Sequence, residues 1–154
     1  MDALNIAREY DSVQYIVIRI GEEKYGIDIS FVDNIVRMQN ITRVPHVQQY
    51  FAGVINLRGE VVPVMSLRLK MGLAADEYSN KTRIIIVKLE NNAPIGLIVD
   101  EVNEVVTLDE RKIDPVTKDS KKTEDTFING IGKNGDNLIS LLDLNMVIGD
   151  KDAI

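Results

Sequence analysis

The chain contains the same sequence pattern twice. Residues 25–36 (YGIDISFVDNIV) align without a gap with residues 95–106 (IGLIVDEVNEVV), and residues 53–67 then align with residues 130–144. The coinciding positions in the first match are Gly26 with Gly96, Ile29 with Val99, Val32 with Val102, and Ile35-Val36 with Val105-Val106. In 154 residues, each copy is too small to be robust alone, so the two copies must share an internal surface. The repeat therefore predicts two similar β units, and a protein that is gripped by partners rather than one that reacts.

The residue types of the repeat favour strands over helices. Val and Ile are abundant, aromatic residues make up only 5% of the chain and Trp is absent, so the core must be aliphatic. About ten short apolar runs alternate with polar turns at the spacing of hairpins, which is typical of small closed barrels. The sequence predicts one domain over 1–154, with a first lobe at about 13–75, a second at about 82–145 and a C-terminal tail at 146–154.

Three segments depart from this simple plan. Residues 31–38 fit either a strand with an irregular entry or an apolar helical stripe, and we expect the strand. A single helical turn is expected at residues 46–51, and a short helix at residues 67–73. Asp143 is placed to cap a second short helix near the C-terminus.

Composition excludes several classes of function. The net charge of -6 opposes binding to a phosphate backbone, so nucleic acid is not an expected partner. With no cysteine, the chain has neither disulfides nor thiolate chemistry. The longest apolar runs are far shorter than the roughly 20 residues of a membrane helix, and the start lacks a signal-peptide pattern. We expect a cytoplasmic protein without direct membrane insertion.

The segments that resemble catalytic or cofactor motifs have simpler explanations. Residues 130–135 match the dinucleotide pattern GxGxxG, but a β run follows instead of a helix, so a hairpin turn is expected. His46 is the only histidine and has no obvious second metal ligand. The adjacent Asp100-Glu101 pair is one part of a surface that carries 24 acidic residues. We therefore predict no enzyme activity, no cofactor and no metal site.

Arg58 lies in a polar turn between two apolar runs and has two plausible roles. It can be an ordinary surface arginine, which composition alone favours. Alternatively, its planar guanidinium can brace the two lobes and hold a binding groove in shape.

The sequence around Arg58 closely resembles the signature of the CheW-like coupling proteins of bacterial chemotaxis. The resemblance rests on Val44-Pro45, on residues 51–68 with their Asn-Leu-Arg-Gly segment, and on flanking pieces at 23–29, 95–102 and 138–144. These pieces stand in the family's order and together span residues 13–148. The Asn-Leu-Arg-Gly segment with its hairpin is the most specific of them.

The resemblance implies a fold, a function and a set of site residues. The fold is all-β, with two similar five-stranded SH3-like β-barrels and short helices. The function is a non-catalytic adaptor that couples the cytoplasmic tip of a chemoreceptor to the regulatory domain of the histidine kinase CheA. The implied receptor-binding groove comprises Val32, Ile35, Arg58 and Val105, supported by Asn34 and Gly59. Apolar candidates for the kinase contact are Ile98, Val99 and Ile139.

One departure and one alternative remain open. The family often has a glutamate where Asn34 stands, so the expected partner of Arg58 is an amide rather than a carboxylate. The alternative function is a small-molecule-binding β-barrel sensor with its pocket between the lobes. A ternary complex with kinase and receptor would distinguish the adaptor from the sensor.

Overall fold

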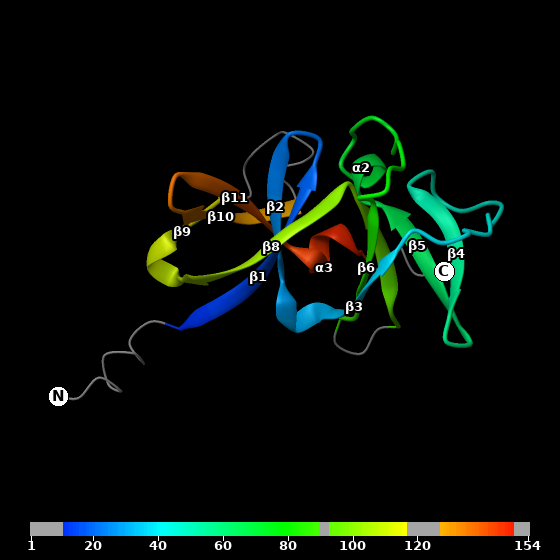
Figure 1. Ribbon diagram of the computed structural model, residues 1–154, viewed down its shortest axis with the longest axis horizontal. Coiled ribbons are helices and arrows are strands. Elements are labelled where there is room, and N and C mark those ends of the chain that lie inside the picture. The colour runs from blue at the N-terminus through cyan, green and yellow to red at the C-terminus, as the bar shows by residue number, and fades with distance from the viewer. Residues whose placement is uncertain (1–10, 90–92, 117–126, 150–154) are drawn as a thin grey trace.

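The protein consists of two β-sheets joined by short helices. The computed structural model describes residues 11–89, 93–116 and 127–149, and Figure 1 shows the sheets side by side. The strands are β1 (Ser12–Ile20), β2 (Glu23–Asp28), β3 (Val32–Arg37), β4 (Phe51–Leu57), β5 (Glu60–Ser66), β6 (Arg83–Val87), β7 (Ile95–Val99), β8 (Glu101–Asp109), β9 (Ile113–Pro115), β10 (Ile128–Asn134) and β11 (Asn137–Leu142). The helical pieces are the 3-10 turns η1 (Ile29–Phe31) and η2 (Glu110–Lys112) and the helices α2 (Leu67–Lys70) and α3 (Leu144–Val147). The all-β fold with short helices is as expected.

Each sheet takes strands from both copies of the repeat. Sheet A has the order β8-β1-β2-β11-β10-β9, and sheet B has the order β3-β6-β7-β5-β4. The first hairpin of each copy therefore pairs with the third strand and the last hairpin of the other copy. Consequently, the expected sequential lobes, 13–75 and 82–145, do not coincide with the sheets. Both arrangements bury the same faces of the strands, so the apolar pattern alone does not distinguish them.

The pairing of the strands repeats with the sequence. The β1–β8 pair corresponds to the β6–β3 pair, and both are antiparallel. The parallel β2–β11 pair likewise corresponds to the parallel β7–β5 pair. Gly26 of β2 and Gly96 of β7 are also equivalent, and both are tightly packed. A Cβ at Gly26 would lie less than 3 Å from a side-chain carbon of Leu141, and a Cβ at Gly96 would lie as close to a side-chain carbon of Ile84. The internal duplication read from the sequence is thus also a duplication of the fold.

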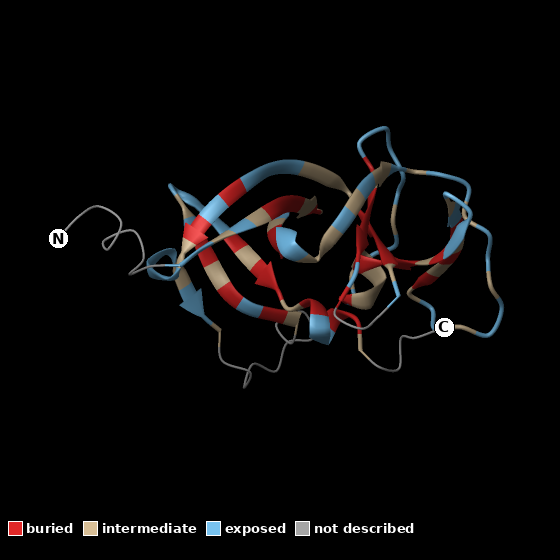
Figure 2. Ribbon diagram, turned by 90° about the horizontal axis from the view of Figure 1, so that it is seen from below, coloured by how far each residue is buried: buried red, intermediate tan, exposed pale blue. Residues whose placement is uncertain are grey.

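Three aliphatic clusters hold the sheets together. One cluster lies within sheet B and includes Ile84, Ile86 and Ile98, and another lies within sheet A and includes Ile139 and Leu141. The largest cluster combines side chains of both sheets with those of α2 and α3, and α3 lies between the sheets in Figure 1. Buried residues accordingly gather along the facing strands, and exposed ones follow the outer loops (Figure 2). Strands such as β6 and β7 are buried on both faces, which explains their uninterrupted apolar sequences.

Local expectations were met in most places. Residues 31–38 form β3 with a 3-10 entry, and Asp143 caps α3 by accepting a hydrogen bond from the Met146 N–H. The GxGxxG segment is the β10–β11 hairpin, with Gly135 at a positive φ in its turn. The expected helical turn at 46–51 is wrong, because this segment consists of turns leading into β4. Of the expected tail at 146–154, the first residues belong to α3 and its end, and residues 150–154 lie outside the described part.

Candidate functional site

The repeat places one apolar side chain on the surface of each sheet. β3 and β8 are equivalent strands, and each carries a bulge at the same position, Asp33 in β3 and Asn103 in β8. A bulge inserts one residue and re-aims the side chains beyond it. Before the bulges, Val32 and Val102 pack against the central cluster. Beyond them, Ile35 is 37% exposed and Val105 is 50% exposed.

The strands that carry these residues occupy equivalent places. β3 is an end strand in the bonding order of sheet B, and β8 is an end strand in that of sheet A. The structure thus gives Ile35 and Val105 equivalent, exposed positions, one on each sheet. Val32 of the predicted groove is half-buried and contributes less free surface than either of them.

Arg58 is an exposed turn residue and does not brace the sheets. It forms the β4–β5 turn with Gly59, and both residues have a positive φ, 55° and 82°. The Gly59 N–H donates to Asn56 Oδ1 at 3.1 Å, while the Oδ1 atom of Asn34 accepts from the Ile35 N–H at 2.8 Å. Within the described residues, no hydrogen bond or ion pair involves the Arg58 side chain. The predicted bracing contact with Asn34 is therefore wrong, because Asn34 bonds to its own strand and Arg58 extends into solvent.

The three predicted kinase contacts are core residues. Ile98 and Val99 are fully buried, and Ile139 is 1% exposed. Ile98 and Ile139 fill the interiors of sheets B and A, and Val99 belongs to the central cluster. Their apolar character, which suggested an interface, instead reflects burial, because β7 is buried along its whole length and Ile139 lies on the buried face of β11. None of the three offers surface to a partner in this structure.

Exposed apolar residues lie on the hairpins next to buried core positions. Leu138 precedes Ile139 on β11 and is 64% exposed, and Val61, its equivalent in the other copy, is also 64% exposed on β5. The sequence did not distinguish these positions from their buried neighbours. The signal that could have done so is their place beside each turn, where the strand leaves the barrel interior.

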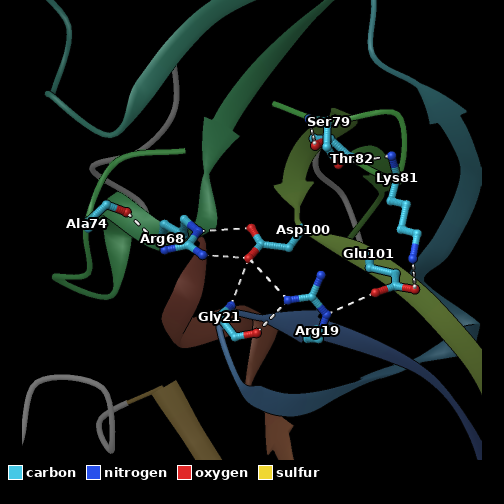
Figure 3. Close-up of polar contacts among 9 residues, drawn as sticks. All are labelled: Arg19, Gly21, Arg68, Ala74, Ser79, Lys81, Thr82, Asp100 and Glu101. Carbon is cyan, nitrogen blue, oxygen red and sulfur yellow. Dashed lines mark hydrogen bonds and ion pairs between the residues drawn. The ribbon is translucent and has the colours of Figure 1, made fainter. Parts of the chain in front are cut away.

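A network of charged side chains lies where β7 of sheet B continues into β8 of sheet A (Figure 3). Arg68 holds the Asp100 carboxylate with two hydrogen bonds, from Nε to Oδ1 at 2.9 Å and from Nη2 to Oδ2 at 2.6 Å. The Gly21 N–H, in the β1–β2 turn of sheet A, also donates to Asp100 Oδ2 at 2.8 Å. Arg19 donates to the Gly21 carbonyl at 2.6 Å and to Glu101 Oε2 at 2.9 Å. Groups on both sides of the crossover therefore bond to the Asp100 carboxylate.

The electrostatics of this network favour its charged form. The hydrogen bonds from Arg68 hold the pKa of Asp100 below its ordinary value, although burial of the carboxyl opposes the shift. Nearby, Asp76 accepts a hydrogen bond from the Ser66 hydroxyl, and burial raises the pKa of this carboxyl. Sequence reasoning set Asp100 aside as one acid among many. The signal it missed is that Arg68 and Asp100 stand where the other copy of the repeat has Asn145 and Ser30.

A hollow of about 720 Å³ lies beside β4 of sheet B. Its lining comes from the segment that follows β3, from the start of β4 and from the exposed Tyr78. This hollow does not lie between the sheets, where the sensor hypothesis places its pocket. The space between the sheets is instead occupied by the central aliphatic cluster.

The described residues contain no group of three or more His, Asp or Glu side chains that could hold a metal ion. Nor is any helix of the described part long and apolar enough to cross a membrane. What the fold presents is a pair of joined β units with apolar side chains exposed at equivalent positions. These features define a protein-interaction module.

Comparisons with known proteins identify the family of this module. Residues 14–152 match the family model of the CheW-like domain. The chain is 38% identical to the chemotaxis protein CheW of Bacillus subtilis (strain 168) over 90% of this chain and 87% of that protein. It is 36% identical to the CheW of Helicobacter pylori (strain ATCC 700392 / 26695) over 88% of this chain and 81% of that protein.

A solved structure agrees with the sequence relatives. The scaffolding protein TtCheW of Thermoanaerobacter tengcongensis superposes with a TM-score of 0.83 at 33% identity, covering 93% of this chain and 97% of that one. The chain belongs to the CheW-like family, and its fold is the family's pair of SH3-like β-barrels.

Proposed function

We propose that this protein is a non-catalytic adaptor of bacterial chemotaxis that couples chemoreceptors to the histidine kinase CheA. Its membership of the CheW-like family and its similarity to the scaffolding protein TtCheW support this function. The observation that carries the proposal is the exposure of Ile35 and Val105 at equivalent positions in a chain whose other strand isoleucines are mostly buried. The proposal includes a cytoplasmic location beside the membrane receptors, reached through these partners.

The receptor surface of the proposal comprises Ile35, Val105, Arg58 and the free part of Val32, with Asn34 and Gly59 as support. Exposed aliphatic side chains at two positions suit the apolar face of an amphipathic helix, as the tip of a receptor would present. The backbone of Arg58 supports a direct contact. A left-handed conformation is costly for a residue other than glycine, and such strain is typical of functional positions.

The kinase surface of the proposal moves from the buried residues to the neighbouring hairpin. Leu138 replaces Ile139 as the anchor, because Leu138 is exposed on the same strand. A few apolar anchors usually provide most of the binding energy of an interface. The partner in this proposal is the regulatory domain of CheA, and its contact lies on sheet A, away from Arg58.

The small-molecule sensor is the weaker candidate. It requires a pocket between the lobes, but aliphatic side chains of both sheets fill that space. The hollow beside Tyr78 is open and lies on one sheet only.

Mixing the purified chain with a CheA fragment and a receptor fragment tests the function. We expect the three proteins to co-elute as a ternary complex on size-exclusion chromatography. Without the chain, the two fragments should elute separately. The adaptor function is contradicted if the chain binds neither fragment, or binds each only in competition with the other.

A further inference from the structure

The charged network at Asp100 joins the two sheets at one point of the fold. The chain passes between sheets twice at equivalent places, from β2 to β3 through η1 and from β7 to β8 through Asp100. Asp100 is contacted by Arg68, which belongs to α2 after a strand of sheet B, and by Gly21, which belongs to the β1–β2 turn of sheet A. One carboxylate therefore bonds to parts of both sheets at the second crossover.

Among the described residues, no such contact is found at the first crossover. By the repeat, Ser30 stands in the place of Asp100, and the exposed Asn145 stands in the place of Arg68. Ser30 bonds to Asp28 of its own turn, through its N–H at 2.9 Å and its hydroxyl at 2.8 Å, and to no other side chain of the described part. A single backbone hydrogen bond, from Lys88 N–H to the Phe31 carbonyl, resembles the bond from Asp100 N–H to the Arg19 carbonyl at the other crossover. As far as the structure describes the chain, the charged contact is thus seen at the second crossover and not at the first.

A directional contact supplies what the aliphatic core does not. The central cluster attracts the sheets, but the hydrophobic effect itself is non-directional. A guanidinium and a carboxylate joined by two parallel hydrogen bonds fix both distance and angle. The side chains of Arg68 and Asp100 are only 20% and 16% exposed, so water competes less for this contact than for a surface pair.

We propose that the Arg68–Asp100 pair is a lock that sets the relative orientation of the two sheets at the second crossover. Asp100 is the positioning residue, and Arg68 with the Gly21 N–H holds it in place. Arg19 reinforces the lock by bonding to the Gly21 carbonyl and to Glu101 at the start of β8. The proposal concerns the free protein and holds whether or not the proposed partners bind.

The distance between two spin labels, one on each sheet, tests the lock. The chain has no cysteine, so Val61→Cys on sheet B and Leu138→Cys on sheet A give two exposed and unique labelling sites. In this labelled protein, Arg68→Lys keeps the charge but loses the planar fork. We expect Arg68→Lys and Asp100→Asn each to broaden the distance distribution measured by pulsed electron spin resonance. The double variant should broaden it no more than the stronger single variant, because both act through one contact.

Two controls separate orientation from general stability. Arg111→Lys changes an arginine that is paired with Asp109 within sheet A, so it should leave the distribution unchanged. Ile84→Val removes a methyl group inside the sheet B cluster and lowers stability without touching the crossover. A distribution that stays narrow in folded Arg68→Lys and Asp100→Asn overturns the proposal. So does equal broadening in Ile84→Val at the same loss of melting temperature.

Discussion

At the scale of single residues, Arg58 shows how an exposed position can be informative. Its φ of 55° and that of Gly59 form a two-residue hairpin turn in which both central residues are left-handed. Such turns prefer Asn-Gly, so the arginine is a poor choice for stability. Because the side chain has no partner within the described residues, folding does not explain why it is there.

Replacing Arg58 by asparagine should separate stability from binding. We expect Arg58→Asn to raise the free energy of unfolding by about 1 kcal/mol, because asparagine adopts the left-handed conformation at lower cost. Affinity for a receptor fragment should fall in the same variant. Urea unfolding and a binding titration measure the two effects. A drop in stability would contradict the turn geometry, and unchanged affinity would remove Arg58 from the receptor surface.

Asp100 should make the protein more stable above its ordinary pKa of about 3.9. Its pKa is lowered in the folded state by the hydrogen bonds from Arg68, so its contribution is complete above the unfolded value and is lost as pH falls through the folded value. Asp100→Asn should therefore be less stable than the parent at pH 7 and should lose less stability on acidification below pH 4. Urea unfolding across this range measures both slopes, and identical slopes would show that the pair contributes nothing.

Asp76 should have the opposite pH dependence. Burial raises its pKa, so the folded state favours the protonated carboxyl and loses stability as pH rises through the raised value. Asp76→Asn should flatten the fall in stability that begins above the ordinary carboxyl pKa of about 4, and the variant should be at least as stable as the parent at pH 7. A clear loss of stability at pH 7 would mean that the contact with Ser66 requires the carboxylate.

At the scale of elements, the sequence predicted which strands and helices form better than it predicted how they are arranged. Most strands and the Asp143 cap of α3 could be read from local pattern, because alternation and capping residues act over a few positions. The burial of Ile98, Val99 and Ile139 could not be read in this way. β7 is buried along its whole length and β11 on one face, and which faces are covered depends on which strands become neighbours. The Arg68–Asp100 contact joins residues 32 apart and was equally hidden.

The glycines of β2 and β7 provide a test of packing inside each barrel. A Cβ at Gly96 would lie 2.7 Å from Ile84 Cγ2, and Gly96 has no positive φ, so the clash is purely steric. We expect Gly96→Ala to lower the free energy of unfolding by about 1–3 kcal/mol. Gly26→Ala should have a similar effect at the equivalent position.

A second substitution shows whether the clash is the cause. In the double variant Gly96→Ala with Ile84→Ala, the space left by the isoleucine should accept the new methyl group. The combined loss should then be smaller than the sum of the two single losses. An additive result, measured by urea unfolding of all four proteins, would contradict the packing of Gly96 against Ile84.

At the scale of the whole molecule, the fold combines an internal duplication with an exchange of strands between the two copies. The repeat correctly predicted two similar units, but the order of strands along the chain suggested sequential lobes. Neighbouring segments usually pair, and here the first hairpin of each copy pairs with the other copy instead. The exchange places one end strand with an exposed aliphatic residue on each sheet. It also produces two crossovers, and within the described ranges the charged contacts between the sheets lie at the second.

In the proposed function, one chain presents separate surfaces to two partners. Complex formation by two matched variants tests this separation. Val105→Glu and Leu138→Glu each place a carboxylate on an exposed strand position, so each variant is the control for the other. Loss of an apolar anchor should cost more than about 1 kcal/mol, or roughly a fivefold loss of affinity. We expect Val105→Glu to bind the CheA fragment like the parent but the receptor fragment at least about fivefold more weakly, and Leu138→Glu to do the reverse. If both folded variants assemble the ternary complex like the parent, or if each loses both partners, the assignment of two separate surfaces is contradicted.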